Sequence, residues 1–371
     1  MKIAMILTNS FDPDPRVFKE AKSLVKLGHK VEIICWDRSG TYIDKPEEII
    51  NEIKIKRFFA NAKYGTGYKQ IFKMFAFKNN VLNYIRENNF EAIHCHDFDG
   101  LFIGYSINRH FKHKLVYDEH DLFYTYFSER KNVINRFLAH FIKFYESFML
   151  KKVDVHIVVT PKMVELYKNK SSKMFLINNA PYKNQFRNID KTHSNKLRIG
   201  FIGSVRYYDE MVAMINASQK YKDKIDIIIS GKGIYLDELT AYASKYSNVK
   251  LTGGYNINEI EELYRNIDVT YAFYPDYAAA ISMPNKYFES IITETPIIAN
   301  IKTEFGYEVN KNRIGYGLLG DNLEIEIHNV LQELLENENI KDVMIENMKS
   351  IKNECYWEAN ETYLDKIYNC K

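Results

Sequence analysis

The residues with the clearest chemistry lie in the second half of the chain, in the segment Ser282-Met283-Pro284-Asn285-Lys286-Tyr287-Phe288-Glu289. Pro284 stands where a helix would begin, so the amides of the first turn would point their N–H groups toward an anion. A phosphate bound there would also meet the charge of Lys286. Glu289, about one turn further along, can accept hydrogen bonds from ribose hydroxyls. Taken alone, the segment equally fits an ordinary helix N-terminus whose glutamate stabilises the helix dipole.

Two glycine turns upstream could bind the same anion. The first follows an apolar run and contains Gly203, Ser204 and Arg206. A glycine turn lets backbone amides approach a phosphate closely, and an arginine can bind it through two hydrogen bonds. The second turn contains Gly231 and Lys232. Each turn is weak evidence by itself, because G-x-G occurs often by chance and Arg206 could equally be solvated.

Histidines and acids gather in the first half. His94 and His96 lie two residues apart on an expected strand, and Asp97 follows them, which would suit a metal ion. No third ligand stands at a metal-site spacing, so we expect no metal site. His120 lies between two acidic residues and is either functional or a structural histidine.

Composition indicates a globular protein. The chain has 371 residues, 46% of them hydrophobic and 27% charged, which predicts more than one folded domain. No apolar run approaches the roughly 20 residues that a membrane span needs, and the N-terminus lacks the pattern of a signal peptide. The four cysteines show no C-x-x-C spacing, which favours a reducing cytoplasm.

Charge is divided unevenly along the sequence. Residues 1–180 hold 29 Lys and Arg against 20 Asp and Glu, a net of +9, whereas the remainder holds 22 against 28, a net of −6. A basic half suits an anionic membrane, a phosphate-bearing lipid or nucleic acid. Of these partners we expect an anionic membrane surface and no nucleic acid.

Apolar strands alternate with helical segments throughout the chain, which predicts an α/β protein with parallel sheets. The alternation stops in a polar, aperiodic segment and then starts again. We therefore expect two doubly wound Rossmann-like domains facing each other across a cleft, with ligands at the carboxyl ends of the strands. The expected parts are residues 1–182, a linker over 183–196, residues 197–354, and a C-terminal helix within 355–371.

Four segments, in this order and at this spacing, resemble the retaining glycosyltransferases with two Rossmann-like domains (the GT-B fold), in particular glycosyl transferases group 1. The resemblance extends from Met1 to the helix at Trp357. It rests on DPRVFKEAKSLVKLGHKVEII at 14–34, HCHDFDG at 94–100, LVYDEHD at 115–121, and residues 283–299.

The resemblance implies a role for each candidate residue. His120 would contact the transferred sugar, Arg206 the pyrophosphate and Glu289 the ribose, and Tyr255 would follow the glycines that bind the nucleobase. The acceptor would be lined by Asp12, Arg16, Asp97 and Asp99. The implied donor site comprises Gly203, Ser204, Arg206, Gly231, Lys232, Tyr255, Ser282, Met283, Pro284, Asn285, Lys286 and Glu289.

The sequence departs from the family pattern at three places. Ile281 stands where a first glutamate often precedes Glu289, and Met211 and Val212 stand where a lysine usually follows the arginine. The glycine-rich turn after the first strand is replaced by Asn9-Ser-Phe-Asp-Pro-Asp-Pro15. Lys286 or Lys232 could supply the missing charge.

Two aromatic segments occur in the basic half. Phe137, Phe141, Phe144 and Phe148 repeat at helical spacing, which predicts a helix side that faces the core. Phe58–Lys78 interleaves aromatics with Lys63, Lys69, Lys73 and Lys78, and we expect it to be an exposed surface that contacts anionic membrane.

These observations predict a metal-independent glycosyltransferase without a cofactor. A UDP-sugar is favoured over a GDP-sugar as donor. The expected acceptor is a glycan or a lipid-linked molecule in bacterial surface polysaccharide synthesis, such as capsule or O-antigen. We expect a cytoplasmic protein that is peripheral on the membrane. The alternatives are a sugar-nucleotide epimerase of the same fold and a catalytically silent homologue that serves as a partner subunit.

Overall fold

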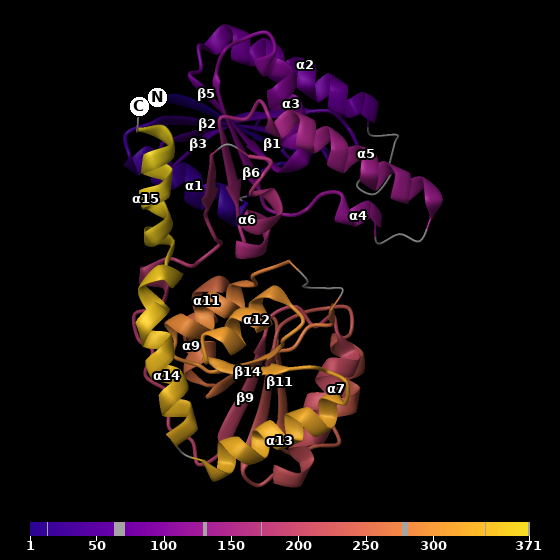
Figure 1. Cartoon of the computed structure of the whole chain (residues 1–371), viewed down its shortest axis with the longest axis vertical. Helices are drawn as coiled ribbons and strands as arrows, with labels where there is room; N and C mark the ends of the chain where they lie inside the picture. Colours follow the sequence, from indigo (N-terminus) through magenta and orange to yellow (C-terminus); the bar gives the residue numbers. More distant parts are fainter. Residues whose placement is uncertain are drawn as a thin grey trace. The chain divides into compact units, whose positions relative to one another are not determined.

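The computed structural model describes residues 1–12, 14–62, 71–128, 132–171, 173–276, 281–337 and 339–369. They form two compact units, drawn in Figure 1: unit 1 contains Met1–Asn178 and Asn360–Lys371, and unit 2 contains Asn179–Ala359. These bounds differ from the expected ones at two places. Residues 183–196, expected as a linker, pack on unit 2, where Lys191 donates hydrogen bonds to Tyr264 O and Thr295 Oγ1. The C-terminal helix passes from unit 2 into unit 1.

Unit 1 is built on an eight-stranded sheet of order β3-β4-β2-β1-β5-β6-β7-β8, in which only β3 and β4 pair antiparallel. Its central strands are buried along nearly their whole length, as expected for a parallel sheet packed between helices. The two strands that were not predicted, β3 and β8, are short edge strands. The strands are β1 Lys2–Leu7, β2 Lys30–Asp37, β3 Glu47–Ile50, β4 Ile53–Phe59, β5 Ala92–His96, β6 Lys114–Glu119, β7 Val155–Val158 and β8 Met174–Leu176.

The helices of unit 1 follow the sequence signals for helix ends. Asp14 caps the first helix by accepting hydrogen bonds from the amides of Arg16 and Val17, and Pro15 occupies its first turn. Gly28, with φ 86°, lies just beyond its end. The helices are α1 Pro15–Lys26, α2 Ile71–Asn88, α3 Asp97–Asn108, α4 Thr125–Ser128, α5 Val133–Leu150, α6 Pro161–Tyr167 and α15 Trp357–Tyr368.

Unit 2 contains a six-stranded sheet of order β11-β10-β9-β12-β13-β14, all parallel. From β9 the chain first winds one way to β11 and then returns to place β12 on the other side of β9. Such a reversal is the switch point at which doubly wound sheets bind ligands. The strands are β9 Leu197–Ile202, β10 Ile225–Ser230, β11 Val249–Gly253, β12 Val269–Ala272, β13 Ile297–Asn300 and β14 Gly315–Leu318.

Two apolar clusters, one centred on Phe201 and the other on Phe288, fill the interior of unit 2. They are closed by helices α7 Tyr208–Ser218, α8 Leu236–Ala243, α9 Ile260–Arg265, α11 Asn285–Ile292, α12 Glu304–Lys311, α13 Leu323–Glu336 and α14 Asn339–Ile351. A helix was predicted to begin at Pro284, and α11 does begin there, with Pro284 as its N-cap.

Helix α5 corrects the prediction that its phenylalanine stripe faces the core. Phe137, Phe141, Phe144 and Phe148 are all exposed. The buried side of the helix instead carries Ala139, Ile142, Glu146, Met149 and Leu150. Both stripes repeat with helical period, so periodicity alone could not decide which of them packs inward. The hydrogen bonds that buried tyrosines donate to the Glu146 carboxylate favour the observed orientation.

The predicted surface at Phe58–Lys78 is only partly described. Residues 63–70, with two of its four lysines, lie outside the described residues. Phe77 is buried and stacks on Trp36 with 5.5 Å between ring centroids, so it belongs to the core. Phe72 and Phe75 at the start of α2 are exposed, as predicted. Among the described residues, no helix is both long and apolar enough to cross a membrane.

Gly104 permits close packing of α3 on the sheet of unit 1. A Cβ there would overlap Cys95 Sγ and press on Ile93 and Leu115. We expect Gly104→Ala to lower the free energy of unfolding by about 1–3 kcal/mol, because overpacking in a core costs that much. Urea denaturation followed by tryptophan fluorescence measures it, since Trp36 lies in the same sheet.

Cys95→Ala removes the overlapping sulfur and provides the control. Gly104→Ala should therefore cost less in the Cys95→Ala background than in the natural one. Equal costs in both backgrounds would contradict the proposed contact.

Candidate functional site

Three glycine turns meet at the carboxyl edge of the sheet of unit 2. They follow the neighbouring strands β9, β10 and β11 and are joined by backbone hydrogen bonds. The amide of Gly203 donates to Ser230 O at 2.8 Å, and that of Gly231 donates to Gly253 O at 2.6 Å. A Cβ at Gly231 would overlap the carbonyl of Gly203, so side chains cannot be added to this junction without moving it. The expected glycines thus form one continuous backbone surface.

Lys286 lies directly beside this surface. Its Nζ occupies the space that a Cβ on Gly203 would fill, and it lies 4.9 Å from the ring centroid of Phe201 and 5.4 Å from that of Tyr274. Helix α11 begins one residue before Lys286, and its N-cap residue, Pro284, makes no side-chain hydrogen bond to the amides of the first turn. The structure thus brings a lysine, a helix N-terminus and a glycine turn together at the switch point between β9 and β12, which suits an anion.

Two further cations come from the other turns. Arg206 is exposed, and its Nε donates a hydrogen bond to Ser204 Oγ at 3.0 Å. Lys232 is also exposed, and the aliphatic part of its side chain lies against Gly254. The amide of Val205 donates to Lys232 O at 2.9 Å, which holds the two turns side by side. Lys286 at the start of α11 and these two loop residues therefore place three cations at one edge of this sheet.

Glu289 lies one turn inside α11 and is buried. Its carboxylate accepts a hydrogen bond from Tyr264 Oη at 3.1 Å. Burial, together with the charge of Glu289, raises the pKa of Tyr255 to about 12, so that the half-buried Tyr255 stays a phenol and a hydrogen-bond donor. The two residues expected to contact ribose and nucleobase are therefore electrostatic neighbours.

The other residues of the predicted segment surround the start of α11. Ser282 is exposed, Met283 packs partly against the core, and Asn285 accepts a hydrogen bond from Asn179 Nδ2 at 3.2 Å. Met211, at the position of the missing lysine, is fully buried in α7. Lys286 supplies a positive charge at the edge where that lysine is lacking.

The candidate residues of unit 1 also lie at a carboxyl edge, after β5 and β6. His120 Nε2 lies 2.6 Å from Asp118 Oδ2, and His120 Nδ1 lies 3.6 Å from Asp97 Oδ2. The amide of His120 donates to Asp97 Oδ1 at 3.2 Å. His96 Nδ1 is 3.2 Å from the same Oδ2 of Asp118. Both nitrogens of the His120 ring thus face carboxylates.

This arrangement keeps His120 charged. Burial disfavours the imidazolium, but the charges of Asp118 and Asp97 outweigh it and raise the pKa of His120 to about 9. Although burial works against ionisation of Asp118, Arg16 and His120 hold the pKa of its carboxyl well below the usual range. The side chain of His120 is 18% exposed, so its charge can reach a ligand.

Arg16 corrects the prediction that it lines the acceptor. It is 5% exposed, and its guanidinium donates to both oxygens of Asp118 and to Ile177 O, and pairs with Glu20 at 2.9 Å. Because its guanidinium is bound by these partners inside unit 1, Arg16 is a structural cation. It holds α1 on the sheet and neutralises Asp118. Its residue type fitted the predicted role, but its position on the inner face of α1 does not.

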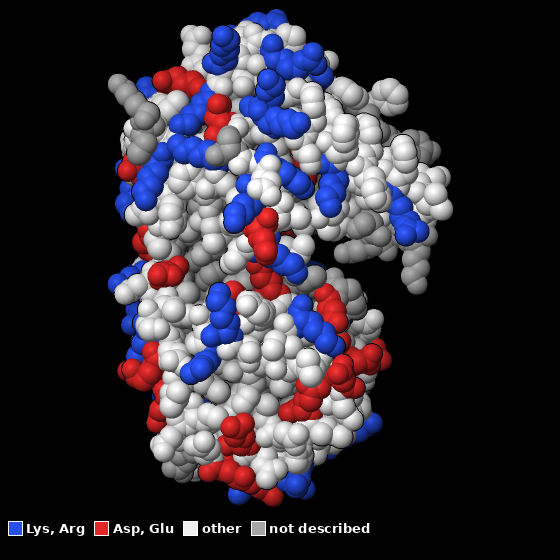
Figure 2. Space-filling view, viewed as in Figure 1, with Lys and Arg blue, Asp and Glu red and all other residues white. Residues whose placement is uncertain are grey.

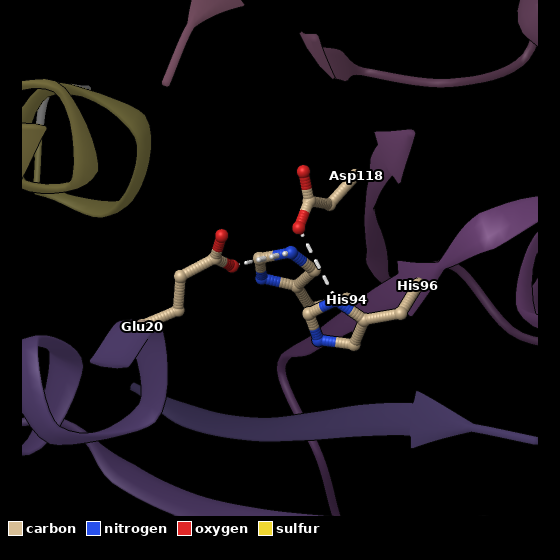
Figure 3. Close-up of side chains that lie close together, drawn as sticks. All are labelled: Glu20, His94, His96 and Asp118. Carbon is tan, nitrogen blue, oxygen red and sulfur yellow. Dashed lines mark hydrogen bonds and ion pairs between the residues drawn. The ribbon is translucent and has the colours of Figure 1, made fainter. Parts of the chain in front are cut away.

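Figure 3 shows four buried side chains that could in principle hold a metal ion: Glu20, His94, His96 and Asp118, with donor atoms within 4.8 Å of one another. Carboxylate and imidazole are zinc ligands. The third and fourth ligands come from α1 and β6, which sequence spacing could not reveal. However, Arg16 already pairs with both carboxylates, so a cation would have to bind against its charge.

The remaining acceptor candidates are placed differently. Asp12 is exposed and accepts a hydrogen bond from Tyr42 Oη at 2.5 Å. Burial raises the pKa of Asp99 to about 6, although Arg38, with its guanidinium 3.8 Å away, opposes the shift. Asp97 has φ 57°, and burial also raises the pKa of its carboxyl. These three carboxylates remain available to a ligand of unit 1.

Sequence reasoning missed Asp118 and His96 as partners of His120. Strand alternation could have revealed Asp118, because residues two apart on a strand point to the same side, as Asp118 and His120 do. The sequence contained no sign that Glu20 and His94 would join this network, with Tyr368 Oη 2.8 Å from His94 Nδ1.

The charge of His120 gives a direct test of this geometry. In Asp118→Asn, the pKa of His120 should fall by about 1–3 units from about 9, because an adjacent carboxylate raises the pKa of a histidine by that amount. Histidine-selective NMR titration measures it, with the resonance assigned by His120→Gln. A His120 pKa that stays near 9 in Asp118→Asn would contradict the dominance of this carboxylate.

The sequence of unit 1 resembles a known protein family, and the fold of the whole chain resembles solved structures. Residues 16–180 match the model of Glycosyltransferase Family 4. No curated protein matches the sequence significantly.

Solved structures match the whole chain. Sucrose-phosphate synthase from Thermosynechococcus elongatus has a TM-score of 0.77 at 13% identity, covering 100% of this chain and 98% of that chain. Alr3699/HepE from Anabaena, in complex with UDP, has a TM-score of 0.73 at 13% identity, covering 100% of each chain. WaaG, a glycosyltransferase involved in lipopolysaccharide biosynthesis, has a TM-score of 0.68 at 14% identity, covering 99% of each chain.

At these identities the structural matches show a shared fold, and the family match covers most of unit 1. The two parallel, doubly wound sheets confirm the predicted fold class. Together, the structural matches show that the chain has the GT-B fold, and residues 16–180 are similar to Glycosyltransferase Family 4.

Proposed function

We propose that the enzyme transfers a sugar from a UDP-sugar to a glycan or lipid-linked acceptor, with retention of anomeric configuration. The observation that carries this proposal is the position of Lys286, whose Nζ lies on the Gly203 turn beside the start of α11. A site of this kind suits the diphosphate of a nucleotide sugar.

The proposed chemistry follows from where negative charge develops. Cleavage of the sugar–phosphate bond leaves charge on the departing diphosphate, and donors already in position stabilise that charge without reorganisation. Lys286, Arg206 and the amides at the start of α11 are such donors. Glu289 would accept hydrogen bonds from the ribose, and the backbone at Gly253 and Gly254 would face the base beside Tyr255. That Alr3699/HepE binds UDP supports a uridine nucleotide.

His120 would contact the transferred sugar, as the family resemblance implies. A histidine held as a cation by Asp118 and Asp97 can donate hydrogen bonds to sugar hydroxyls and stabilise developing negative charge. Asp12, Asp97 and Asp99 would receive the acceptor hydroxyl on unit 1. Neutralisation of the diphosphate by side chains supports catalysis without a metal ion or any other cofactor.

The acceptor class is inferred from the net charge of residues 1–180 and from the structural similarity to WaaG. Residues 1–180 carry a net charge of +9, which suits a phosphate-bearing lipid or an acidic glycan. The name of WaaG places it in lipopolysaccharide biosynthesis, and we infer a related role in bacterial surface polysaccharide synthesis for this chain. The enzyme would then work in the cytoplasm, at the inner face of the membrane.

Two alternatives give different expectations. A sugar-nucleotide epimerase would need additional acid/base carboxylates next to the donor sugar and no acceptor. A silent homologue would bind the nucleotide without turnover, and Ile281 in place of the first glutamate is the feature that favours it. The Lys286–Gly203 geometry supports nucleotide binding under all three readings, so turnover decides between them.

Nucleotide binding should depend on α11. We expect Lys286→Ala and Glu289→Ala each to weaken UDP binding about 10- to 150-fold, because losing a hydrogen bond to a charged group costs about 1.5–3 kcal/mol. Isothermal titration calorimetry with UDP measures both.

Lys222→Ala is the matched control, because Lys222 is exposed near the opposite, amino edge of the same sheet. It should bind UDP like the natural protein. If Lys286→Ala and Glu289→Ala also bind UDP with unchanged affinity, the donor site lies elsewhere.

A further inference from the structure

We propose that α5 and the first turn of α2 form a docking surface for an anionic lipid bilayer. This deepens the proposed function, on which it rests, by naming the lipid surface as the partner of unit 1. The docking surface comprises Phe72, Phe75, Val133, Ile134, Phe137, Phe141, Phe144 and Phe148 with the cations between them.

Exposure of these apolar side chains is unusually high. Phe72 is 82% exposed, Val133 78%, and both Phe137 and Phe144 72%. Single exposed apolar residues are ordinary, but a run of them over about four turns of one helix is a contiguous patch. Such a patch on a protein surface usually marks an interaction site.

The orientation of α5 follows from its own periodicity. At 100° per residue, Phe144 lies 200° around the helix from Ile142, and Phe137 lies 200° from Ala139. The phenylalanine stripe is therefore opposite the stripe that packs on unit 1. The buried stripe is fixed by Glu146, whose carboxylate accepts hydrogen bonds from Tyr117 Oη at 2.9 Å and Tyr167 Oη at 3.2 Å.

Aromatic contacts join α5 to α2 across α3. The ring centroid of Phe102 in α3 lies 6.0 Å from that of Phe75 and 6.1 Å from that of Tyr145. Tyr145 in turn stacks with Phe141 at 6.1 Å. Phe75 of α2 and Phe141 of α5 thus belong to one series of aromatic contacts.

Charge identifies the partner. Arg136 and Lys143 are exposed on α5, Lys151 and Lys152 are exposed directly after it, and Lys73 is exposed beside Phe72. The single acidic residue of α5 is the buried Glu146. In Figure 2 the face over α3 and α5 shows uncharged and basic side chains. Within α5 the exposed charged side chains are all basic, and phenylalanines among such cations match a bilayer with anionic headgroups.

A second copy of the chain is a poorer occupant. A two-fold contact through α5 would place the same patch on both sides and bring its cations against one another. An anionic bilayer meets both the apolar and the basic component. The membrane-contacting surface was predicted at Phe58–Lys78. Among the described residues we now assign it to α5 together with Phe72 and Phe75.

Cosedimentation with vesicles tests the proposal. The full-length protein should bind vesicles of phosphatidylcholine with 30% phosphatidylglycerol at low salt, bind less at high salt, and bind pure phosphatidylcholine at least tenfold more weakly. Phe137→Ser/Phe144→Ser should lower the partition coefficient at least tenfold. Arg136→Gln/Lys143→Gln should lower it and flatten its salt dependence.

Ile325→Ser/Val343→Ser is the matched control, because both side chains are comparably exposed but lie on α13 and α14 of unit 2. It should bind vesicles like the natural protein. UDP affinity should be unchanged in every variant, so failure of lipid binding and failure of the donor site remain distinguishable.

The proposal is overturned if the natural protein stays in the supernatant with anionic vesicles, or if the two α5 variants bind as well as the control. It is also overturned if light scattering shows a dimer that Phe137→Ser/Phe144→Ser converts to a monomer while vesicle binding is absent. That last result would assign the surface to a second copy.

Discussion

Neighbouring parallel strands end at the same edge of their sheet, and the candidate site in each unit depends on that constraint. In unit 2 it brings the turns at Gly203, Gly231 and Gly253 together, although they are far apart in sequence. The reversal of strand order beside β9 then leaves room for the start of α11 and for Lys286. The order of winding thus assembles an anion site from segments that individually resemble ordinary turns.

In unit 1 the same constraint delivers His96, Asp118 and His120 to one place, and burial determines their charges. An isolated buried carboxylate would be strongly destabilising, so Asp118 is stable only because Arg16 and His120 surround it. The guanidinium that the sequence suggested for a ligand is used inside the protein. Because Asp118 stays ionised, His120 keeps its positive charge at the edge of the sheet, where it could donate a hydrogen bond to a sugar hydroxyl.

Most of the fold could be predicted from the sequence, because buried parallel strands are nearly continuous apolar runs and glycine, proline and aspartate mark the helix ends. The edge strands β3, β8 and β14 were not predicted, and each has only three or four residues, too few for a clear strand pattern. In unit 2 helix α11 begins at Pro284 as expected, because the signal for a helix start is local in the sequence. Arg16, Glu20 and the orientation of α5 could not be predicted, because each depends on contacts between residues distant in sequence. Arg16 contacts Asp118, Glu20 contacts His94, and two tyrosines fix the side of α5 that carries Glu146.

Turnover measures most directly whether the edge of unit 2 that carries Lys286, Arg206 and Lys232 serves sugar transfer. The purified protein is incubated with a panel of UDP- and GDP-sugars, with and without EDTA, and nucleoside diphosphate release is followed together with the identity of the remaining sugar nucleotide. We expect UDP release from at least one UDP-sugar, unaffected by EDTA and strongly reduced in Lys286→Ala. Conversion of one sugar nucleotide into its epimer, or UDP binding without release from any donor, would contradict this expectation.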